Sequence, residues 1–411
     1  MPRRIPPVTS CDIVVAGHLC LDVTPKFRIT GARSLAELLR PGSLVHVDEC
    51  VISTGGPVSN TGISLNTIGA HAVLMGKVGD DAFGRVVIEK MRERGFGDGI
   101  QIVPGEQTSY TIVIAPPGVD RVFLHNPGAN NTYGADDVDY SLLDGARAFH
   151  FGYPPLMERM YRNGGAELIE MFKRAKQRGV TTSLDMSLPD PRSAAGQTDW
   201  DAILRKLLPF VDVFLPSAEE MLLFLERAEF LRKMERAAAQ GEELLRQLEP
   251  ADYSRLAGRL IEYGAGVVTL KSGYRGIYVR TAGPDRLRRF GRATVGDLDD
   301  WSHRELWEPA FHVDAVVSAT GSGDSAIAGF LASFLRHESL EDALRYATAA
   351  GRQNVLVHDA TSGIRSFEHT RAELPSLRKS ALDIDAEGWR RDEQGQRWIG
   401  PGDGRPSESH A

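Results

Sequence analysis

Short runs of β-branched and apolar residues alternate with longer stretches of helical periodicity along most of the chain. The apolar runs predict six strands, over residues 12–17, 71–76, 147–152, 180–185, 211–215 and 266–270. The periodic stretches predict helices near 59–68, 82–95, 155–178, 218–247, 251–264, 323–336 and 340–356. This alternation is typical of a mostly parallel sheet with helices on both faces. In such a sheet, ligands bind at the carboxyl ends of the strands.

Two segments interrupt the alternation and predict a second, smaller sheet. Residues 23–52 contain VHVDECVIS, which alternates as an exposed strand does. Residues 103–127 contain two apolar runs around a Pro–Pro–Gly turn, which predicts a hairpin, with an ordinary surface hairpin as the alternative. Residues 281–306 are polar and predict a surface loop. The polar, Gly- and Pro-rich residues 384–411 predict a disordered or loosely docked tail.

The composition is that of an ordinary globular protein of 411 residues, enough for one large domain with a smaller attachment. Lys and Arg total 48 against 55 Asp and Glu, and the formal charge of −7 argues against a nucleic-acid partner. No apolar run approaches the ~20 residues of a membrane span or forms a signal peptide. The scattered Cys11, Cys20 and Cys50 predict no disulfide framework. We therefore expect a cytoplasmic protein without a membrane partner.

The most informative motif is SATGSGD at residues 318–324, which the apolar run AIAGFLASFL follows closely. Gly321 and Gly323 permit a tight turn, and the apolar run predicts a buried helix that starts there. The backbone N–H groups of Gly321, Ser322 and Gly323 form an anion site, because a helix start presents unpaired donors and the positive end of its dipole. The carboxylate of Asp324 beside this site suggests a base that accepts a hydroxyl proton during phosphoryl transfer.

Two other interpretations of this motif remain open. Asp324 is also a residue type that commonly caps helices. Gly321, Gly323 and Ala326 also fit the dinucleotide-binding spacing G-x-G-x-x-G/A. That fingerprint normally opens a nucleotide-binding domain, and fewer than 90 residues follow it here. The phosphate-loop pattern G-x-x-x-x-G-K-[ST] is absent from the sequence.

A second glycine cluster lies near the N-terminus. Gly55 and Gly56 precede a predicted helix that carries Asn60, and GKVGDDAFG follows at residues 76–84. With both regions present, the chain resembles the ribokinase-like sugar kinases, also called the PfkB family. Their signatures are a Gly-Gly…Asn segment that runs into G-x-V-G-x-D-x-x-G, and a C-terminal T-G-x-G-D.

The resemblance covers roughly residues 10–370 and implies a Rossmann-like α/β fold. The kinase domain would span residues 10–375, with a small β-sheet lid built from the segments at about 23–52 and 103–127. In the family, two such lids often pair, so the resemblance also implies a homodimer formed through the lid.

The resemblance implies roles for residues on the sugar side of the site. Asp324 matches the catalytic base, and the N–H groups of Gly321, Ser322 and Gly323 match the anion hole. Asp22 matches the acidic residue that binds sugar hydroxyls, with a turn aspartate as the alternative. The other substrate-binding candidates are Gly55, Gly56, Asn60, Arg121 and Asn126.

The nucleotide side carries a second set of matches. Ser217 and Glu220 fit the family's N-x-x-E pattern with Ser in place of Asn, and the glutamate would order Mg²⁺ and the phosphates through water. Ser-x-x-Glu at a helix start is also a capping box, and both roles are compatible. Lys271, Gly273 and Gly276 match a K-x-G-x-x-G turn near the nucleotide. The remaining nucleotide-binding candidates are Thr320, Thr348 and Gly351.

One departure concerns a monovalent cation. The family often has D-T-T-G-A-G-D, in which the first Asp and Thr help to hold the ion. Ser318 and Ala319 stand in these places, and neither side chain carries a charge. Potassium activation is therefore in doubt, whereas the anion hole and the base are intact.

We predict a kinase that uses ATP and Mg²⁺ to phosphorylate a hydroxyl group of a small sugar or sugar-like alcohol. Ribose, ketohexoses, sugar acids and nucleosides remain open as substrates. Lys26 and Arg28 lie just beyond Asp22 and could meet an anionic substrate group or be solvated lid charges. The alternatives are a nicotinamide enzyme built on Gly321 and Gly323, and a non-catalytic sugar- or nucleotide-sensing protein on a kinase scaffold.

Overall fold

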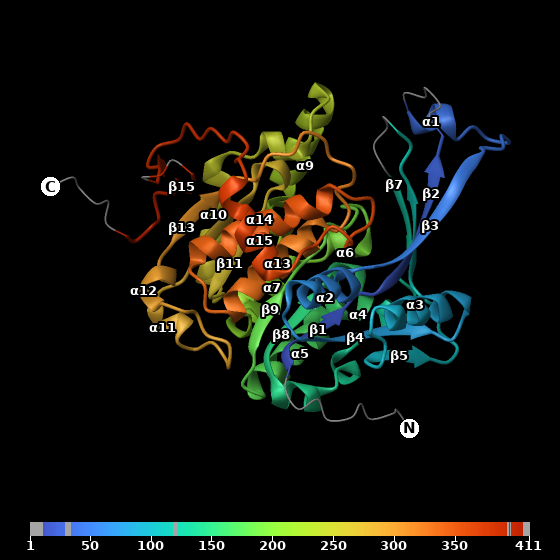
Figure 1. Cartoon of the computed structure of the whole chain (residues 1–411), viewed down its shortest axis with the longest axis horizontal. Coiled ribbons are helices and arrows are strands. Elements are labelled where there is room, and N and C mark those ends of the chain that lie inside the picture. The colour runs from blue at the N-terminus through green and yellow to red at the C-terminus, as the bar shows by residue number, and fades with distance from the viewer. Residues whose placement is uncertain (1–10, 29–33, 118–121, 393, 395, 406–411) are drawn as a thin grey trace.

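Two sheets organise the computed structural model, which describes residues 11–28, 34–117, 122–392, 394 and 396–405. The large sheet has eleven strands in the order β14-β15-β13-β12-β11-β10-β9-β8-β1-β4-β5, and the small sheet has four in the order β3-β2-β6-β7. Figure 1 shows helices around the large sheet and the small sheet projecting beside it. This arrangement confirms the predicted α/β architecture with a second, smaller sheet.

Seven neighbouring strands of the large sheet run parallel to one another. In sheet order they are β5 (Ile100–Val103), β4 (Ala72–Gly79), β1 (Cys11–Gly17), β8 (Ala146–Gly152), β9 (Thr181–Leu184), β10 (Val213–Phe214) and β11 (Val267–Lys271). The sequence predicted all of them except β5, a four-residue strand with two exposed positions. Helices bury both faces of the central strands, which explains why these strands are continuously apolar.

The sheet continues on one side with antiparallel strands. These are β12 (Ile277–Thr281), β13 (Glu305–Glu308), β15 (Trp398–Ile399) and β14 (Arg390–Arg391). The short helices α11 (Pro284–Leu287) and α12 (Leu298–Trp301) and the start of β13 lie within the segment that was predicted as a surface loop. The loop prediction is wrong for these elements, where Trp301 and Leu306 are fully buried.

The described part of the C-terminal segment packs against this side of the large sheet. β15 pairs with β13, and Trp389 lies 6.0 Å from Trp307, measured between ring centroids. Arg397 is only 4% exposed, and its guanidinium lies 3.3 Å from the buried carboxylate of Glu308. For the residues described, these contacts favour the docked alternative over the disordered one, because polar side chains of this segment have buried partners.

Helices form one layer on each face of the large sheet. One layer contains α2 (Pro57–Ile68), α3 (Ala82–Glu93), α13 (Ser322–Leu335), α14 (Leu340–Val355) and α15 (Phe367–Glu373). The other contains α5 (Ala166–Gln177), α7 (Trp200–Leu207), α8 (Ala218–Leu225), α9 (Arg227–Gln240) and α10 (Pro250–Glu262). Alternate residues of β1 enter the two cores, Ile13 on one side and Val14 on the other. None of the described helices is long and apolar enough to cross a membrane.

Two long helices predicted from periodicity are interrupted in the structure. The stretch 155–178 contains α4 (Glu158–Tyr161) and α5, separated by Asn163 and Gly164 at φ 52° and 65°. The stretch 218–247 contains α8 and α9, separated at Glu226, where φ is −141°. Neither backbone conformation can continue a right-handed helix, although the apolar period persists across each break.

The small sheet consists of the two segments that interrupt the alternation. β2 (Cys20–Phe27) pairs antiparallel with β3 (Val47–Gly55) and parallel with β6 (Tyr110–Ile114). β6 pairs antiparallel with β7 (Val122–Asn126), as the predicted hairpin requires. Short helices α1 (Leu35–Leu38) and α6 (Ala194–Gln197) complete the described helices. Because β2 follows β1 almost directly, the small sheet stands at the carboxyl edge of the large one.

Candidate active site

Asp324 lies in the first turn of α13 and is 2% exposed. The residue before this helix, Gly321, has φ 79°, in the left-handed region that favours glycine. A β-carbon at Gly321 would also lie 2.5 Å from the side chain of Ala360. Because Gly321 has no side chain to cap the helix, the first-turn N–H of Gly323 can meet an anion, and the N–H of Ser322 makes only a long bond of 3.4 Å to the backbone oxygen of Ala319. The structure thus places the glycine turn and the carboxylate at one helix start, as expected from the sequence.

The carboxylate of Asp324 accepts hydrogen bonds from three side chains. Asn60 Nδ2 donates to Oδ2 at 3.0 Å, and Thr61 Oγ1 lies 3.4 Å from Oδ1. The hydroxyl of Tyr153 lies 3.0 Å from both oxygens. Burial raises the pKa of Asp324, and the hydrogen bonds and the charge of Lys271 offset part of that rise. A carboxylate with a raised pKa and well-placed donors is a candidate proton acceptor.

Tyr153 and Thr61 were missed by the sequence analysis. Tyr153 directly follows β8 and has φ 64° and ψ 41°, a left-handed conformation that is uncommon for a tyrosine. Its position at the carboxyl end of a central parallel strand could have marked it, since ligands bind at that edge. Thr61 adjoins Asn60 on α2, which packs against α13.

Asp22 lies on β2 and is half-buried. Its Oδ1 accepts a hydrogen bond from the Cys20 thiol at 3.3 Å. Burial raises the pKa of Asp22 to about 6, and the negative charge of Asp324 adds to the rise. The influence of one carboxylate on the other places Asp22 near the Asp324 cluster.

The glycine pair has a clear packing role next to Asp22. A β-carbon at Gly55 would lie 2.6 Å from Cγ of Asp22. Gly56 has φ 84°, and a β-carbon there would lie 2.7 Å from Nδ1 of His18. Both positions therefore require glycine for steric reasons, whether or not a ligand also approaches the backbone.

A pair of histidines next to Asp22 was also missed by the sequence analysis. Nε2 of His18 lies 3.4 Å from Nε2 of His125, which is on β7 of the small sheet. Nδ1 of His125 lies 3.0 Å from Oγ1 of Thr111 on β6. Burial lowers the pKa of both imidazoles, that of His18 to well below its usual value. The small sheet therefore contributes an uncharged, hydrogen-bonding wall.

One substrate-binding candidate from the hairpin, Asn126, has a partner in its own turn. Oδ1 of Asn126 accepts the backbone N–H of Gly128 at 3.0 Å, so the side chain stabilises the turn after β7. The other hairpin candidate, Arg121, lies outside the described residues. Lys26 and Arg28 form ion pairs with exposed Glu49 and Asp48, which favours their interpretation as solvated charges of the small sheet.

Lys271 at the end of β11 forms a buried ion pair with Asp185, which follows β9. Its ammonium also donates to the backbone oxygen of Leu215. A β-carbon at Gly323 would lie 3.4 Å from Cε of Lys271, so this lysine runs past the start of α13. Asp185 was missed by the sequence analysis, although it stands at the carboxyl end of a parallel strand.

Ser217 and Glu220 form the capping box of α8. The backbone N–H of Glu220 donates to Oγ of Ser217 at 3.2 Å, and the backbone N–H of Ser217 donates to Oε2 of Glu220 at 2.7 Å. The charge of Glu220 also raises the pKa values of Asp185 and Lys271, which places all three in one cluster.

The glycines of the K-x-G-x-x-G turn support a tight connection between β11 and β12. Gly273 and Gly276 have φ 51° and 93°. A β-carbon at Gly276 would lie 2.6 Å from the backbone nitrogen of Ala310. Close packing against the end of β13 is thus enough to require glycine at position 276.

Of the last three nucleotide candidates, Thr320 and Gly351 lie around the start of α13. The backbone N–H of Thr320 donates to Oγ of Ser318 at 3.2 Å. The Thr348 hydroxyl donates within α14, to the backbone oxygen of Leu344 at 3.1 Å. Gly351 faces the first turn of α13, since a β-carbon there would lie 3.6 Å from the backbone oxygen of Ser322.

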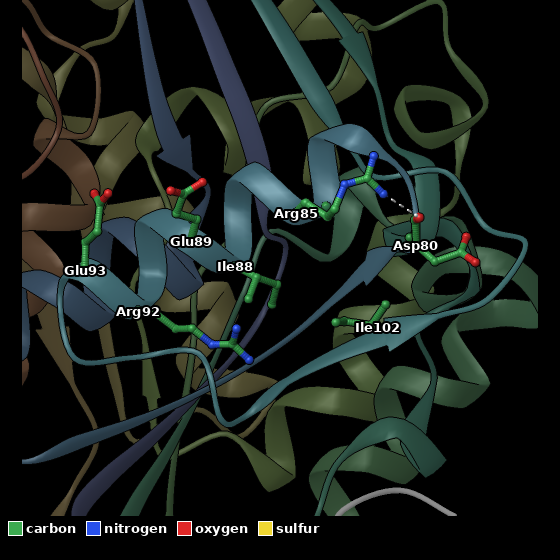
Figure 2. A pocket seen from close by; sticks show the side chains of 9 residues that line it. Asp80, Arg85, Ile88, Glu89, Arg92, Glu93 and Ile102 are labelled. Carbon is green, nitrogen blue, oxygen red and sulfur yellow. Dashed lines mark hydrogen bonds between the residues drawn. The ribbon is translucent and has the colours of Figure 1, made fainter.

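A separate groove of about 560 Å³ lies between α3 and the edge strand β5. Figure 2 shows charged side chains of α3, such as Arg92 and Glu89, around the apolar Ile88 and Ile102. The groove shares no residue with the Asp324 cluster, so we assign it no part in the chemistry.

A buried carboxylate at a glycine-turn helix start, on the carboxyl side of a parallel sheet, is an arrangement that can serve phosphoryl transfer. The family model described as "pfkB family carbohydrate kinase" matches residues 12–366. The chain belongs to the pfkB family of carbohydrate kinases. This confirms the resemblance inferred from the two glycine motifs.

Individual relatives agree with this assignment. The Arabidopsis thaliana protein "Probable fructokinase-6, chloroplastic" is 26% identical over 324 residues, which cover 76% of this chain and 72% of the relative. The structure of Arabidopsis thaliana ribokinase with ribose and ATP has a TM-score of 0.63 at 19% identity, and covers 89% and 99% of the two chains. A candidate ribokinase II from E. coli in complex with ATP and Mg²⁺ has a TM-score of 0.65 at 18% identity, with the same coverage. These structures establish the ribokinase-like fold.

Proposed function

We propose that this carbohydrate kinase transfers the γ-phosphoryl group of ATP to a hydroxyl group of a small sugar or sugar-like alcohol, with Asp324 as the general base. The observation that carries the proposal is the position of Asp324, a buried carboxylate in the same helical turn as the N–H groups that follow Gly321. A base and an anion site in one helical turn can act on both partners of the new bond: the base on the attacking hydroxyl and the anion site on the phosphoryl group.

Each residue of the cluster has a defined task in this proposal. Asp324 accepts the proton of the sugar hydroxyl as that oxygen bonds to the γ-phosphorus. The N–H groups of Gly321, Ser322 and Gly323 stabilise the negative charge of the transferred group. Asp22 accepts hydrogen bonds from two other hydroxyls and so fixes the orientation of the sugar.

The residues on the nucleotide side fit ATP and Mg²⁺. Lys271 brings a buried positive charge beside the start of α13, where phosphates would lie. Carboxylate oxygens are the protein ligands that Mg²⁺ prefers, and Glu220 would hold the ion through water. When bound, Mg²⁺ supplies charge neutralisation for the phosphates.

We also propose that the small sheet acts as a lid over the sugar and pairs with a second copy of the chain. Three consecutive residues of its edge strand β7, Val122, Phe123 and Leu124, are 39–50% exposed. An exposed apolar edge strand is a natural site for strand pairing between copies. Leu124→Lys should convert a dimer into a monomer in light scattering, whereas a wild-type protein that is monomeric would refute the pairing.

A turnover assay tests the proposed function. ADP release would be followed with Mg²⁺ and ATP against D-ribose, D-fructose, sugar acids and nucleosides, in sodium and in potassium buffers. Asp324→Asn should lower sugar-dependent turnover by about 10²–10⁴-fold and retain ATP binding. The control Asp48→Asn, on the exposed edge of the small sheet, should behave as wild type. Absence of turnover with every acceptor while ATP still binds would favour the sensing alternative.

A further inference from the structure

Protein donors surround both carboxylate oxygens of the proposed base. Asn60 donates to Oδ2 at 3.0 Å, and Thr61 Oγ1 lies 3.4 Å from both Oδ1 and the backbone oxygen of Asp324. The Tyr153 hydroxyl lies 3.0 Å from each carboxylate oxygen, so it covers both of them with one proton. A sugar hydroxyl that approaches the side held by this phenol can donate to Asp324 only after the phenol moves away.

Tyr153 is the donor best suited to move. Asn60 and Thr61 lie within the regular helix α2 and are 4% and 0% exposed. Tyr153 lies in the loop after β8, directly after Gly152, and keeps a left-handed backbone at φ 64°. A non-glycine residue in that conformation stores strain, and such strain concentrates at residues that change conformation during function.

The ring of Tyr153 also lies on the sugar side of the base. Its centroid is 6.2 Å from that of His18, and the His18 ring is 5.1 Å from that of His125 on the small sheet. The phenol therefore extends from the base toward the wall that the small sheet contributes. Burial and the charge of Asp324 raise the pKa of Tyr153 well above its usual value, so its hydroxyl keeps its proton.

We propose that Tyr153 determines which acceptor reaches the base: its hydroxyl excludes water from Asp324 and gives way to a sugar hydroxyl. The inference rests on the proposed kinase function. A sugar held by several contacts has binding energy with which to displace the phenol, whereas a water molecule held by one or two contacts does not.

The reaction that Tyr153 suppresses is hydrolysis of ATP. In that reaction the oxygen of water bonds to the γ-phosphorus, and the bond from phosphorus to the bridging oxygen breaks with its electron pair left on ADP. The proton of the attacking water passes to Asp324, and the products are ADP and inorganic phosphate. With Tyr153 in place, its hydroxyl holds the position next to both carboxylate oxygens that the attacking water would need.

The experiment compares Tyr153→Phe with Tyr133→Phe. The Tyr133 hydroxyl is buried and has no hydrogen-bond partner among the described residues, so its removal is a matched control. With Mg²⁺ and ATP alone, Tyr153→Phe should release ADP about tenfold faster than wild type, and Tyr133→Phe should not. Its KM for the active sugar should fall by a larger factor than any change in kcat. Tyr153→Gly, which suits the left-handed backbone and also removes the ring near His18, should likewise release ADP faster than wild type without sugar.

Two results would overturn the role of Tyr153. One is unchanged sugar-independent ADP release in both Tyr153 variants. The other is a lower kcat with an unchanged KM, which would show that the phenol stays in place and supports the base. The acceptor panel with the wild type separates the two proposals. If no sugar supports turnover, the kinase function and this inference are both refuted. If a sugar supports turnover but the variants hydrolyse ATP no faster than wild type, only the role of Tyr153 is refuted.

Discussion

Replacing Asp22 by asparagine should stabilise the protein at neutral pH while weakening sugar binding. Burial raises the pKa of Asp22 to about 6, from an ordinary value of 3.8. That difference in pKa means that the folded state favours the protonated carboxyl over the carboxylate by about 3 kcal/mol more than the unfolded state does. Because the side chain is half-buried, solvent screening reduces the expected gain of Asp22→Asn to about 1–2 kcal/mol.

The sign of the effect follows from linkage. A carboxyl group whose pKa is raised on folding contributes stability that is fully present below pH 3.8 and is lost as the pH rises through about 6. The wild type therefore carries an unfavourable buried charge at pH 7.5, and the asparagine variant does not. The gain of the variant should shrink between pH 6 and pH 4 as the wild-type carboxyl takes up its proton.

Urea unfolding at pH 7.5, 6.0 and 4.5 measures this gain. The matched control is Asp48→Asn, which removes a carboxylate of the small sheet whose side chain is 50% exposed and paired with Arg28. The control should change the free energy of unfolding by less than about 1 kcal/mol. The reasoning fails if Asp22→Asn is no more stable than wild type at pH 7.5, or if its gain persists at pH 4.5.

Three further predictions follow from the contacts of the described residues. Asp324→Asn should lower kcat by about 10²–10⁴-fold with little change in ATP affinity, because a general base contributes about that factor; steady-state kinetics and ATP titration measure the two effects. Gly55→Ala should raise the KM for sugar by about tenfold or more, because the new methyl group would displace the Asp22 carboxylate. Steady-state kinetics measures this KM, and an unchanged value would contradict the assigned role of Asp22. Arg397→Ala should lower the free energy of unfolding by about 3–5 kcal/mol, because it removes a buried partner of the fully buried Glu308. Urea denaturation measures the loss. A change below about 1 kcal/mol would show that the C-terminal segment contributes little to the stability of the protein.

The local part of the site could be predicted from sequence because its features are close together in the chain. The glycine turn and Asp324 lie within a few residues of each other, and so do the capping partners Ser217 and Glu220. The central strands were also predictable, because burial on both faces makes each a continuous apolar run. The broken helices were not, since a single left-handed residue such as Asn163 ends a helix without changing the apolar period.

The remaining site residues are brought together by distant parts of the chain. Tyr153 and Asp324 are 171 residues apart, His18 and His125 are 107 apart, and Lys271 and Asp185 are 86 apart. No spacing pattern connects such pairs, because each depends on how distant strands, loops and helices pack in space. Asp324 lies on α13, His125 lies on the small sheet, and β10 separates β9 from β11.

The sequence by itself determined the class of fold, the family and the position of the proposed base. The class of fold follows from the periodicity of apolar residues, and the family and the base follow from short motifs. Both signals come from residues that are close together in the chain. Only the tertiary structure decided what surrounds the base, namely that Tyr153 lies across both carboxylate oxygens and that His125 faces His18 from the small sheet. It also decided that the polar C-terminal segment packs on the large sheet. The physical reason is that hydrogen bonding and burial depend on distances in space, which parallel strands and packed helices set between residues far apart in the chain.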